Sequence, residues 1–558
     1  MPNGATQLVA SLEAHGVEYV FGVCGDTSVG LYRTLAEADT PVTHVLARDE
    51  RSASFMADAY ARVSGRPGVC EGPSGGGATY LLPGLSEAND SCVPVVGLNT
   101  TTPVRYRGRG VLTELDQADL FDTVTKWNAS VDHPDQVPGK VREAFRQATA
   151  GRPGATHLSL PMDTLAGESD GEVYAPERTT RCPADRPRPD PSALDRAADR
   201  LRAAEAPLIV AGGGVHTSRA WTELREFAET AGVPVAGTLT SAGCLGDSPY
   251  WVGVLGENGS REYANDLRDE ADLLVLAGTA VESVWTEKWS RPPDRRTEIV
   301  HVDVAPESIG KNYETAVAVP ADLRVALSGL RERVDGRLDG GRDPAALRRH
   351  HEAWVEPYAA RFDADDFPVR PERMVAGANE VLDDDAVIVS DPGTSCPYLA
   401  ALYEFAEPGR HWLTPRAHGA LGYALPGIVG AHYARPDAQV VGFTGDGSLG
   451  TCMGELETLA RLDLPVTLVV VNNDAFSWIE AGQRSFADFA FGVEFGSANY
   501  AAVAEQLGLA GFRVESADDY EATLAAAVET DGPALVDLPT TPLPDLDDVP
   551  VDWLEPDE

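Results

Sequence analysis

Lysine is nearly absent from this 558-residue chain. It occurs only as Lys126, Lys140, Lys288 and Lys311, whereas Asp and Glu together number 87 and the formal net charge is −42. Self-repulsion of this size opposes folding unless salt screens it, and molar salt shortens the Debye length to about 3 Å. Because the acidic excess runs along the whole sequence, we expect a halophilic protein, with an ordinary acidic protein as the alternative. No nucleic-acid partner is expected, because a phosphate backbone would be repelled.

The sequence also lacks paired cysteines, a membrane-length apolar run and a secretion signal. The seven cysteines are far apart and form no CxxC pair: Cys24, Cys70, Cys92, Cys182, Cys244, Cys396 and Cys452. We interpret them as buried thiols. No stretch reaches the roughly 18 apolar residues of a membrane span, and residues 1–4 do not resemble the start of a signal peptide. These absences predict a cytoplasmic protein without membrane contact.

Apolar residues make up 43% of the chain, enough for more than one hydrophobic core. Domains usually hold about 100–200 residues, so three are expected. Apolar strands alternate with amphipathic helical segments, which predicts an α/β fold of parallel sheets flanked by helices, the central one Rossmann-like. The predicted boundaries are a first domain at 1–165, a linker at 166–190, a central domain at 191–335, a linker at 336–370, a third domain at 371–545 and an acidic tail at 546–558.

The apolar runs also locate individual strands. They lie at 19–23, 93–97, 207–211, 233–235, 271–276, 299–302, 386–389, 439–443 and 466–471. The run at 466–471 is continuously apolar, which is typical of a strand buried on both faces of a parallel sheet. The third domain therefore has the clearest sheet signal.

A glycine-rich turn and an asparagine pair carry the strongest chemical signal. Gly445, Asp446, Gly447 and Ser448 follow one predicted strand, and Asn473 and Ala475 follow the next. Such a turn at a helix start binds anions, and the 24 residues between Gly447 and Asn472 leave room for one crossover helix and a return strand. Asp446, the Asn473 side chain and the Ala475 carbonyl would then hold Mg²⁺ and, through it, a diphosphate. An ordinary Gly-Asp-Gly turn is the alternative.

With these motifs, the chain resembles the thiamine diphosphate-dependent 2-oxoacid decarboxylases and carboligases, and within them the acetolactate synthase-like branch, over almost its whole length. The resemblance implies a pyrimidine-binding, a central and a diphosphate-binding domain, with thiamine diphosphate and Mg²⁺ as cofactors. It also implies a small 2-oxoacid substrate and an active site between the subunits of a homodimer or homotetramer. The acidic composition suggests a haloarchaeal member.

Glu50, within the sequence Arg48-Asp49-Glu50-Arg51, resembles the glutamate that activates the cofactor in this family. A carboxyl group beside the pyrimidine N1′ promotes the imino form of the ring. Such an acid needs a raised pKa, which an apolar pocket supplies by desolvation. The alternative is a solvated glutamate that caps a helix expected at 52–62.

Further matches concern cofactor contacts. Residues 391–395, which include Gly393, resemble a diphosphate-contacting loop with Thr394 and Ser395 as hydroxyl donors. By the same resemblance, Gly419 offers its carbonyl to the 4′-amino group, and Leu421 is the apolar wedge that bends the cofactor. The loop at 71–79 resembles the family's Gly-Pro-Gly-Ala-Thr turn but is three residues longer.

Substrate contacts are less defined. Asp26 lies where simple decarboxylases carry a catalytic aspartate, or else it caps the next helix. Thr113 replaces the glutamine of the Phe-Gln-Glu motif of acetolactate synthases. His418 contacts substrate or moves a proton, or else is structural. Trp478 and Glu480 line the substrate pocket, or else their segment only packs, with Phe476 and Ile479 on one helical face.

The central domain departs from the flavin-binding members of the family. Residues 278–285 replace their Arg-Phe-Asp-Asp-Arg-like run, and Ala305 replaces the second aspartate of their His-Ile-Asp-Ile-Asp-Pro segment. We therefore expect no bound FAD. The resemblance implies 2-oxoacid decarboxylation followed by carboligation. A decarboxylase that releases an aldehyde and a non-catalytic nucleotide-binding or cofactor-binding homologue are the alternatives.

Overall fold

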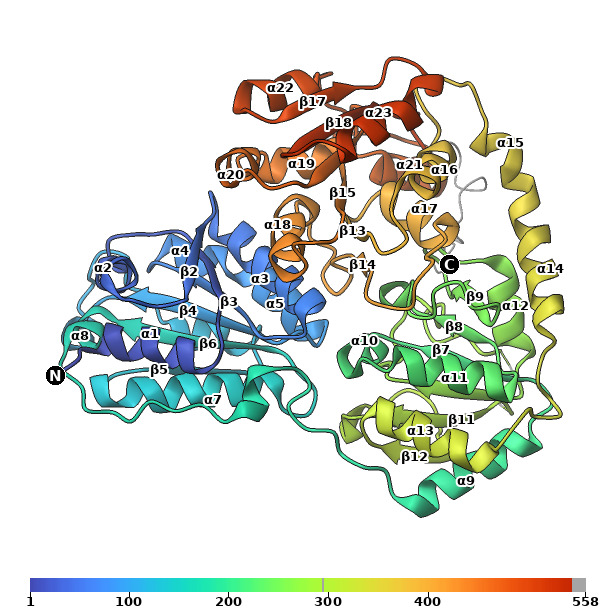
Figure 1. Ribbon diagram of the computed structural model, residues 1–558, viewed down its shortest axis with the longest axis horizontal. Helices are drawn as coiled ribbons and strands as arrows, with labels where there is room; N and C mark the ends of the chain where they lie inside the picture. Colours follow the sequence, from blue (N-terminus) through green and yellow to red (C-terminus); the bar gives the residue numbers. More distant parts are fainter. Residues whose placement is uncertain (294–295, 544–558) are drawn as a thin grey trace. The chain divides into compact units, whose positions relative to one another are not determined.

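The computed structural model describes residues 1–293 and 296–543, and Figure 1 shows its elements. Within these residues the strands form three six-stranded sheets. Every strand pairing in them is parallel. The predicted α/β class with three sheet domains is confirmed, whereas the predicted boundaries between the domains stay a prediction. The acidic tail expected at 546–558 lies outside the described residues.

The first sheet has the strand order β2-β1-β3-β4-β6-β5. Its strands are β1 (Tyr19–Gly22), β2 (Thr43–Leu46), β3 (Gly68–Gly72), β4 (Val95–Thr101), β5 (Trp127–Ser130) and β6 (Ala155–Pro161). Its helices are α1 (Gly4–Ala14), α2 (Val29–Glu37), α3 (Glu50–Ser64), α4 (Gly76–Tyr80), α5 (Leu82–Asp90), α6 (Gln117–Asp122), α7 (Val137–Thr149) and α8 (Met162–Ala166). Leu8, Leu31 and Phe145 from α1, α2 and α7 share one core with Val69 and Leu158 of the sheet, while α3 and α5 pack together (Figure 1).

The second sheet has the order β12-β11-β10-β7-β8-β9, which is the doubly wound order of dinucleotide-binding folds. Its strands are β7 (Pro207–Ala211), β8 (Val235–Gly237), β9 (Trp251–Val254), β10 (Leu273–Ala277), β11 (Glu298–Asp303) and β12 (Val317–Pro320). The helices of this part are α9 (Pro191–Ala203), α10 (Gly214–Ser218), α11 (Trp221–Ala231), α12 (Glu262–Glu270) and α13 (Leu323–Val334), followed by α14 (Pro344–Val355) and α15 (Ala359–Phe362). The Rossmann-like prediction for this domain thus agrees with the strand order.

The third sheet repeats the order of the first, as β14-β13-β15-β16-β18-β17. Its strands are β13 (Val387–Ser390), β14 (Trp412–Leu413), β15 (Val440–Gly445), β16 (Thr467–Asn472), β17 (Ala510–Arg513) and β18 (Ala534–Pro539). The helices are α16 (Pro371–Val381), α17 (Ser395–Leu402), α18 (Ala424–Ala434), α19 (Asp446–Cys452), α20 (Glu455–Leu462), α21 (Ser477–Ala487), α22 (Tyr500–Leu507) and α23 (Tyr520–Val528). Strand β16 is buried at every position, as its apolar run predicts.

By contacts, the chain divides into two compact units. The first comprises Met1–Asp185, Pro415–Asp437 and Thr451–Leu464, and the second comprises Arg186–Thr414, Ala438–Gly450 and the chain from Pro465 onward. Within the first unit, α18 packs along α3. By its contacts, the segment at 415–437 therefore belongs to the same unit as the first sheet. In the sequence, however, it lies between β14 and β15 of the third sheet.

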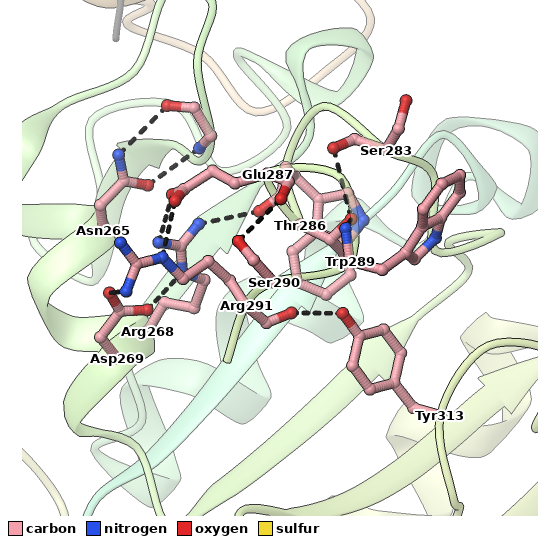
Figure 2. A network of polar contacts seen from close by, with 12 residues as sticks. Asn265, Arg268, Asp269, Ser283, Thr286, Glu287, Trp289, Ser290, Arg291 and Tyr313 are labelled. Carbon is pink, nitrogen blue, oxygen red and sulfur yellow. Dashed lines mark hydrogen bonds and ion pairs between the residues drawn. The ribbon is translucent and has the colours of Figure 1, made fainter. Parts of the chain in front are cut away.

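In the central domain, the chain's own polar groups hold the end of the segment that departs from the flavin pattern and the residues that follow it, up to Arg291 (Figure 2). The buried Arg268 donates to Asp269 at 2.8 Å, to Glu287 at 2.5 Å and to the carbonyl of Trp285 at 2.8 Å. Arg291 donates to Glu287 at 2.6 Å. These contacts do not test the expectation about FAD, which stays a prediction.

Two details of the sequence interpretation were wrong. Cys24 is exposed and Cys92 is half-buried, so the expectation of buried thiols holds for the other five cysteines. Two helices, α19 and α20, lie between β15 and β16 where one crossover helix was expected. Among the described residues, no helix has both the length and the apolar character needed to cross a membrane.

Candidate active site

Asp446 lies at the point where β15 ends and α19 begins. Its Oδ1 accepts a hydrogen bond from the amide of Gly447 at 2.7 Å, and its Oδ2 accepts from the amides of Asn473 at 3.2 Å and Asp474 at 2.6 Å. Because β15 and β16 are neighbours, their carboxyl ends meet, and the predicted juxtaposition of Asp446 with Asn473 is confirmed. Burial raises the pKa of Asp446 to about 6, although the three amides act in the opposite direction.

The donor set at this point fits a hard cation. Asn473 Oδ1 is buried and accepts no hydrogen bond within the described chain, so an unmet oxygen acceptor lies next to the Asp446 carboxylate. Ala475, the third predicted ligand, is buried just beyond it. No group of three or more His, Cys, Asp or Glu suited to a metal occurs in the described ranges. The predicted set instead combines one carboxylate with amide and carbonyl oxygens, which is a donor set that Mg²⁺ accepts.

Glycines at the ends of β13 and β15 leave room for a ligand. A Cβ atom placed on Gly393 or Gly445 would meet no other atom within 4 Å. A Cβ on Gly447, in contrast, would lie 2.5 Å from the Phe476 ring, so this position is closely packed. The open side of Gly445 faces space that a phosphate can use, which agrees with the predicted diphosphate cradle.

The hydroxyl residues predicted for diphosphate binding lie on the same edge of the sheet. Thr394 and Ser395 start α17 and are buried, and Ser448 is buried in the first turn of α19. The Ser395 hydroxyl lies 2.9 Å from that of Ser390 at the end of β13. Their role as phosphate donors stays a prediction.

The structure adds Asp391 to this part of the site. It is fully buried after β13, and its Oδ2 accepts from the Thr444 hydroxyl of β15 at 2.7 Å. The bond ties together the ends of the two strands that bear the predicted cofactor residues. The sequence holds only a weak signal for it, an aspartate directly after an apolar strand.

Glu50 is the first residue of α3 and is 8% exposed. The helix is capped by Asp49, whose side chain accepts from the amide of Arg51 at 2.7 Å, so the alternative in which a solvated Glu50 is the cap is wrong. The Glu50 carboxyl faces two glycines: a Cβ on Gly77 would lie 2.9 Å from Oε1, and one on Gly72 would lie 3.2 Å from Cγ. Burial raises the pKa of Glu50, as expected for an acid that holds a proton for the pyrimidine.

The loop at 71–79 contacts two segments that the sequence had also singled out. The Ser74 hydroxyl lies 2.7 Å from that of Thr113, and the Ser74 amide donates to the Thr27 hydroxyl at 3.0 Å. Thr113 is exposed and has a φ of 65°, an unusual conformation for a β-branched residue that is typical of functional sites. Asp26 is exposed, and the N-cap of α2 is Ser28, so the alternative in which Asp26 caps the helix is wrong.

The turn that carries Gly419 is held by an acidic side chain that the sequence did not single out. Glu87 of α5 is fully buried, and its Oε2 accepts from the amide of His418 at 3.0 Å. The His418 side chain is exposed, and its Nε2 lies 2.9 Å from Asp90 Oδ2, which supports a structural role. Gly419 is exposed with a φ of 63°, and Leu421 is half-buried.

A buried ion-pair network continues from Glu87 along α3. Arg62 donates to Glu87 at 3.0 Å and to Asp58 at 2.6 Å, and the Tyr423 hydroxyl also donates to Asp58 at 2.6 Å. These charges are paired within the protein, which is the condition for burying them. The network fixes the turn at 416–422 relative to the helix that Glu50 starts.

The remaining substrate candidates lie on α21. Glu480 is buried and is paired with Arg484, and Trp478 packs partly against the core of the third sheet. Ile479 is 53% exposed, so the interpretation of Phe476 and Ile479 as one packed face is wrong. No described contact assigns Trp478 or Glu480 to a substrate, and their roles stay predictions.

Comparison with known proteins agrees with this geometry. Three thiamine pyrophosphate enzyme profiles match the chain: the N-terminal TPP binding domain at residues 2–120, the central domain at 194–330 and the C-terminal TPP binding domain at 391–538. Thiamine pyrophosphate is another name for thiamine diphosphate. The fold and the site thus define a thiamine diphosphate-dependent enzyme.

Similar proteins include acetolactate synthases. A probable acetolactate synthase large subunit of Methanocaldococcus jannaschii is 32% identical, with 98% of this chain and 93% of the relative covered. Isozyme 1 large subunit of Escherichia coli is 30% identical (96% and 93% covered), and acetolactate synthase 2 of Nicotiana tabacum chloroplasts is 32% identical (96% and 82% covered). The chain therefore belongs to the acetolactate synthase-like branch of the thiamine pyrophosphate enzymes.

Proposed function

We propose that the chain catalyses the thiamine diphosphate- and Mg²⁺-dependent decarboxylation of a small 2-oxoacid, followed by transfer of the remaining acyl unit to a second carbonyl compound. The observation that carries this proposal is the buried Glu50 carboxyl between Gly72 and Gly77, in a chain that matches acetolactate synthases along 98% of its length. When bound, thiamine diphosphate supplies the nucleophilic carbon and the electron sink for the loss of CO₂.

The residues of the chain divide the remaining work. Asp446, Asn473 and the Ala475 carbonyl would hold Mg²⁺, which would neutralise the diphosphate. Glu50 would supply and take back a proton for the pyrimidine ring, and the Gly419 carbonyl would accept a hydrogen bond from the amino group of that ring. The unmet Asn473 oxygen and the raised pKa of Glu50 support these assignments. Further residues proposed to hold the cofactor are Gly393, Thr394, Ser395, Leu421, Gly445, Gly447 and Ser448.

One observation favours a second candidate, a decarboxylase that releases an aldehyde. Asp26 is exposed in the loop after β1 and does not cap α2, so its carboxyl group is available to take up a proton and pass it to a product. The replacement of the acetolactate synthase glutamine by Thr113 also favours the decarboxylase. In this case the acyl unit is captured by a proton instead of a carbonyl.

A substrate panel separates the two candidates. The purified protein is incubated in molar salt with thiamine diphosphate, Mg²⁺ and either pyruvate or a longer 2-oxoacid, and CO₂, acetolactate and aldehyde are measured. Acetolactate with one CO₂ per two pyruvates supports the carboligase, and one aldehyde per CO₂ supports the decarboxylase. If no 2-oxoacid is turned over, both candidates are wrong.

The cofactor is proposed to bind between two copies of the chain, as the family resemblance implies. This assembly requires a homodimer or homotetramer. Light scattering in molar salt, with and without cofactor and Mg²⁺, tests it, and a monomer that remains fully active would contradict it. The cytoplasmic location and the halophilic character expected from the sequence also stay predictions.

A further inference from the structure

A second carboxyl group, that of Glu71, interacts electrostatically with Glu50 and has no part in the proposed mechanism; the residue after it, Gly72, lies against the Glu50 side chain. Glu71 is the penultimate residue of β3 and is fully buried. Its Oε2 lies 2.8 Å from the Tyr32 hydroxyl on α2, and the Ser28 hydroxyl also bonds to the carboxyl. Burying a carboxyl in its charged form is costly. The protonation state of Glu71 therefore decides whether a negative charge acts on the neighbouring Glu50.

The sheet makes room for this carboxyl at Gly22. In the register of the first sheet, Gly22 of β1 is paired with Glu71 on one side and Leu46 of β2 on the other. A Cβ on Gly22 would lie 2.9 Å from Glu71 Oε2. The missing side chain lets the Glu71 carboxyl lie across β1, toward the edge strand β2.

The hydrogen-bond chain continues to that edge. The Tyr32 hydroxyl lies 2.7 Å from Nε2 of His44, a half-buried residue of β2. A phenol has one proton, so Tyr32 donates in one of its two bonds and accepts in the other. Glu71, Tyr32 and His44 thus form a continuous proton path from the buried carboxyl to the edge of the sheet.

The groups around the path set its resting state. Burial raises the pKa of Glu71 to about 8, and the charge of Glu50 acts in the same direction, against the hydrogen bonds from Tyr32 and Ser28. Burial also raises the pKa of Tyr32, with the acidic groups Glu71, Cys24 and Glu50 adding to the effect. Burial raises the pKa of the neighbouring Cys70 thiol as well.

At the far end of the path, burial lowers the pKa of His44 to about 4, and the positive charge of Arg461 adds to the effect. At neutral pH, the arrangement therefore has Glu71 as a neutral acid that donates to Tyr32, while Tyr32 donates to a neutral His44 imidazole. All three groups are uncharged in this state, which suits their burial.

We propose that Glu71 is a positioning residue for Glu50: a neutral acid that exchanges its proton with solvent through Tyr32 and His44, and so leaves Glu50 as the carboxyl of the pair that ionises. The inference rests on the function proposed for Glu50. Two carboxyls that share a low-dielectric site do not both ionise readily, and the more deeply buried one retains the proton.

The exchange itself is a balanced proton shift. The Glu71 proton passes to the Tyr32 oxygen while the Tyr32 proton passes to His44 Nε2. The resulting imidazolium then releases its Nδ1 proton to solvent. The reverse sequence reloads Glu71, and no other reactant is needed.

The protonation of Glu71 is tested on the protein without cofactor or metal, by infrared spectroscopy in molar salt at pH 6 to 10. The difference spectrum between the wild type and Glu71→Gln should contain the carbonyl band of a protonated carboxyl at neutral pH, and this band should fade as the pH passes about 8. Tyr32→Phe should shift the band, because it removes the hydrogen bond. Tyr60→Phe, which removes another largely buried phenol of the same domain, should not shift it.

The link to Glu50 is tested by pH profiles of kcat/KM for the loaded enzyme. Glu71→Gln mimics the neutral acid, so its kcat/KM at pH 7 should stay within about twofold of wild type, and its alkaline limb should move up by about one pH unit. Tyr32→Phe should move the limb in the same direction, because Glu71 then holds its proton more tightly.

Two results overturn the proposal. One is a difference spectrum with only carboxylate bands at pH 6 to 7, which would make Glu71 an anion. The other is a uniform loss of activity at every pH in Glu71→Gln, which would indicate a merely structural role. A protonated Glu71 in a protein that turns over no 2-oxoacid would instead contradict the proposed function.

Discussion

The first and third sheets have the same strand order, yet the chemistry at their carboxyl ends differs. In the first, the segments that follow β1 and β3 are joined by the bond from the Ser74 amide to the Thr27 hydroxyl, and burial raises the pKa of the Glu50 and Glu71 carboxyls there. In the third, the ends of β13 and β15 are joined by the Thr444 to Asp391 bond, and an Asp446 carboxylate surrounded by amides faces the unmet oxygen of Asn473. The same strand order thus carries the proposed proton site in the first sheet and the predicted cation site in the third.

This comparison first predicts that a substitution at the first sheet can abolish proton transfer while cofactor affinity stays almost unchanged. In Glu50→Gln, turnover should fall by about 10²–10⁴, because the amide has no proton to exchange with N1′. Mg²⁺-dependent binding of thiamine diphosphate, measured by fluorescence titration, should change less than about threefold, because the affinity arises mainly at the other sheet. Full activity of the variant would remove Glu50 from the mechanism.

The reverse variant tests the cation site. Asp446→Asn should weaken Mg²⁺-dependent cofactor binding by about a hundredfold, since a neutral amide replaces the one carboxylate of the predicted donor set. Asp463→Asn is the matched control, because Asp463 is an exposed residue in a left-handed conformation that asparagine also adopts. Equal affinities for both variants would mean that the metal binds elsewhere.

Two neighbouring glycines, Gly76 and Gly77, test how closely the Glu50 carboxyl is packed. A Cβ on Gly77 would lie 2.9 Å from Glu50 Oε1 and 2.5 Å from Pro73 Cδ, whereas one on Gly76 would meet nothing within 4 Å. Gly77→Ala should displace the carboxyl and lower kcat about tenfold or more, and Gly76→Ala should stay within about twofold. Steady-state kinetics with the 2-oxoacid that the substrate panel selects tests this prediction, and equal effects would show that Glu50 tolerates the contact.

The smallest change in turnover is expected for Glu71→Gln, whose main effect is on stability. The carboxyl has an ordinary pKa of 4.5 and a pKa of about 8 in the fold, so between these values the folded state holds a proton that the unfolded state has released. The contribution of Glu71 to the free energy of unfolding is therefore complete below this window. It declines by about 1.4 kcal/mol per pH unit across the window and is absent above it.

Glutamine lacks this titration. Denaturant unfolding in molar salt should therefore show a stability difference between Glu71→Gln and wild type that moves in favour of the variant as the pH rises from 5 to 8. A difference that does not depend on pH would contradict the raised pKa of Glu71.

Much of the fold and of the cation site followed from local sequence patterns. The apolar run at 466–471 predicts β16, and the turn at 445–448 with Asn473 predicts the cation site, because adjacent parallel strands bring their ends together. Glu50 was found from its segment, although the cap of its helix proved to be Asp49. Where a feature is encoded in a short pattern of neighbouring residues, the sequence alone is enough to predict it.

Glu71, Glu87 and Asp391 were missed for a common reason. Each is an acid whose burial depends on partners far away in the chain, such as Tyr32 for Glu71 and the amide of His418 for Glu87. A single sequence shows the charge but not the partner, and an acidic residue is usually exposed. The exposed Cys24 is the converse case, an apolar thiol that the loop after β1 leaves on the surface.

Glu87 has a consequence for the rate at which backbone amides exchange with solvent. The amides of Ala417 and His418 lie in an exposed turn, yet both donate to a side chain of α5, at 3.4 and 3.0 Å. Their hydrogen exchange is therefore governed by the opening of α5, not by the mobility of the turn. We therefore expect the turn that carries Gly419 to keep its shape for as long as α5, a helix more than three hundred residues earlier in the chain, stays folded.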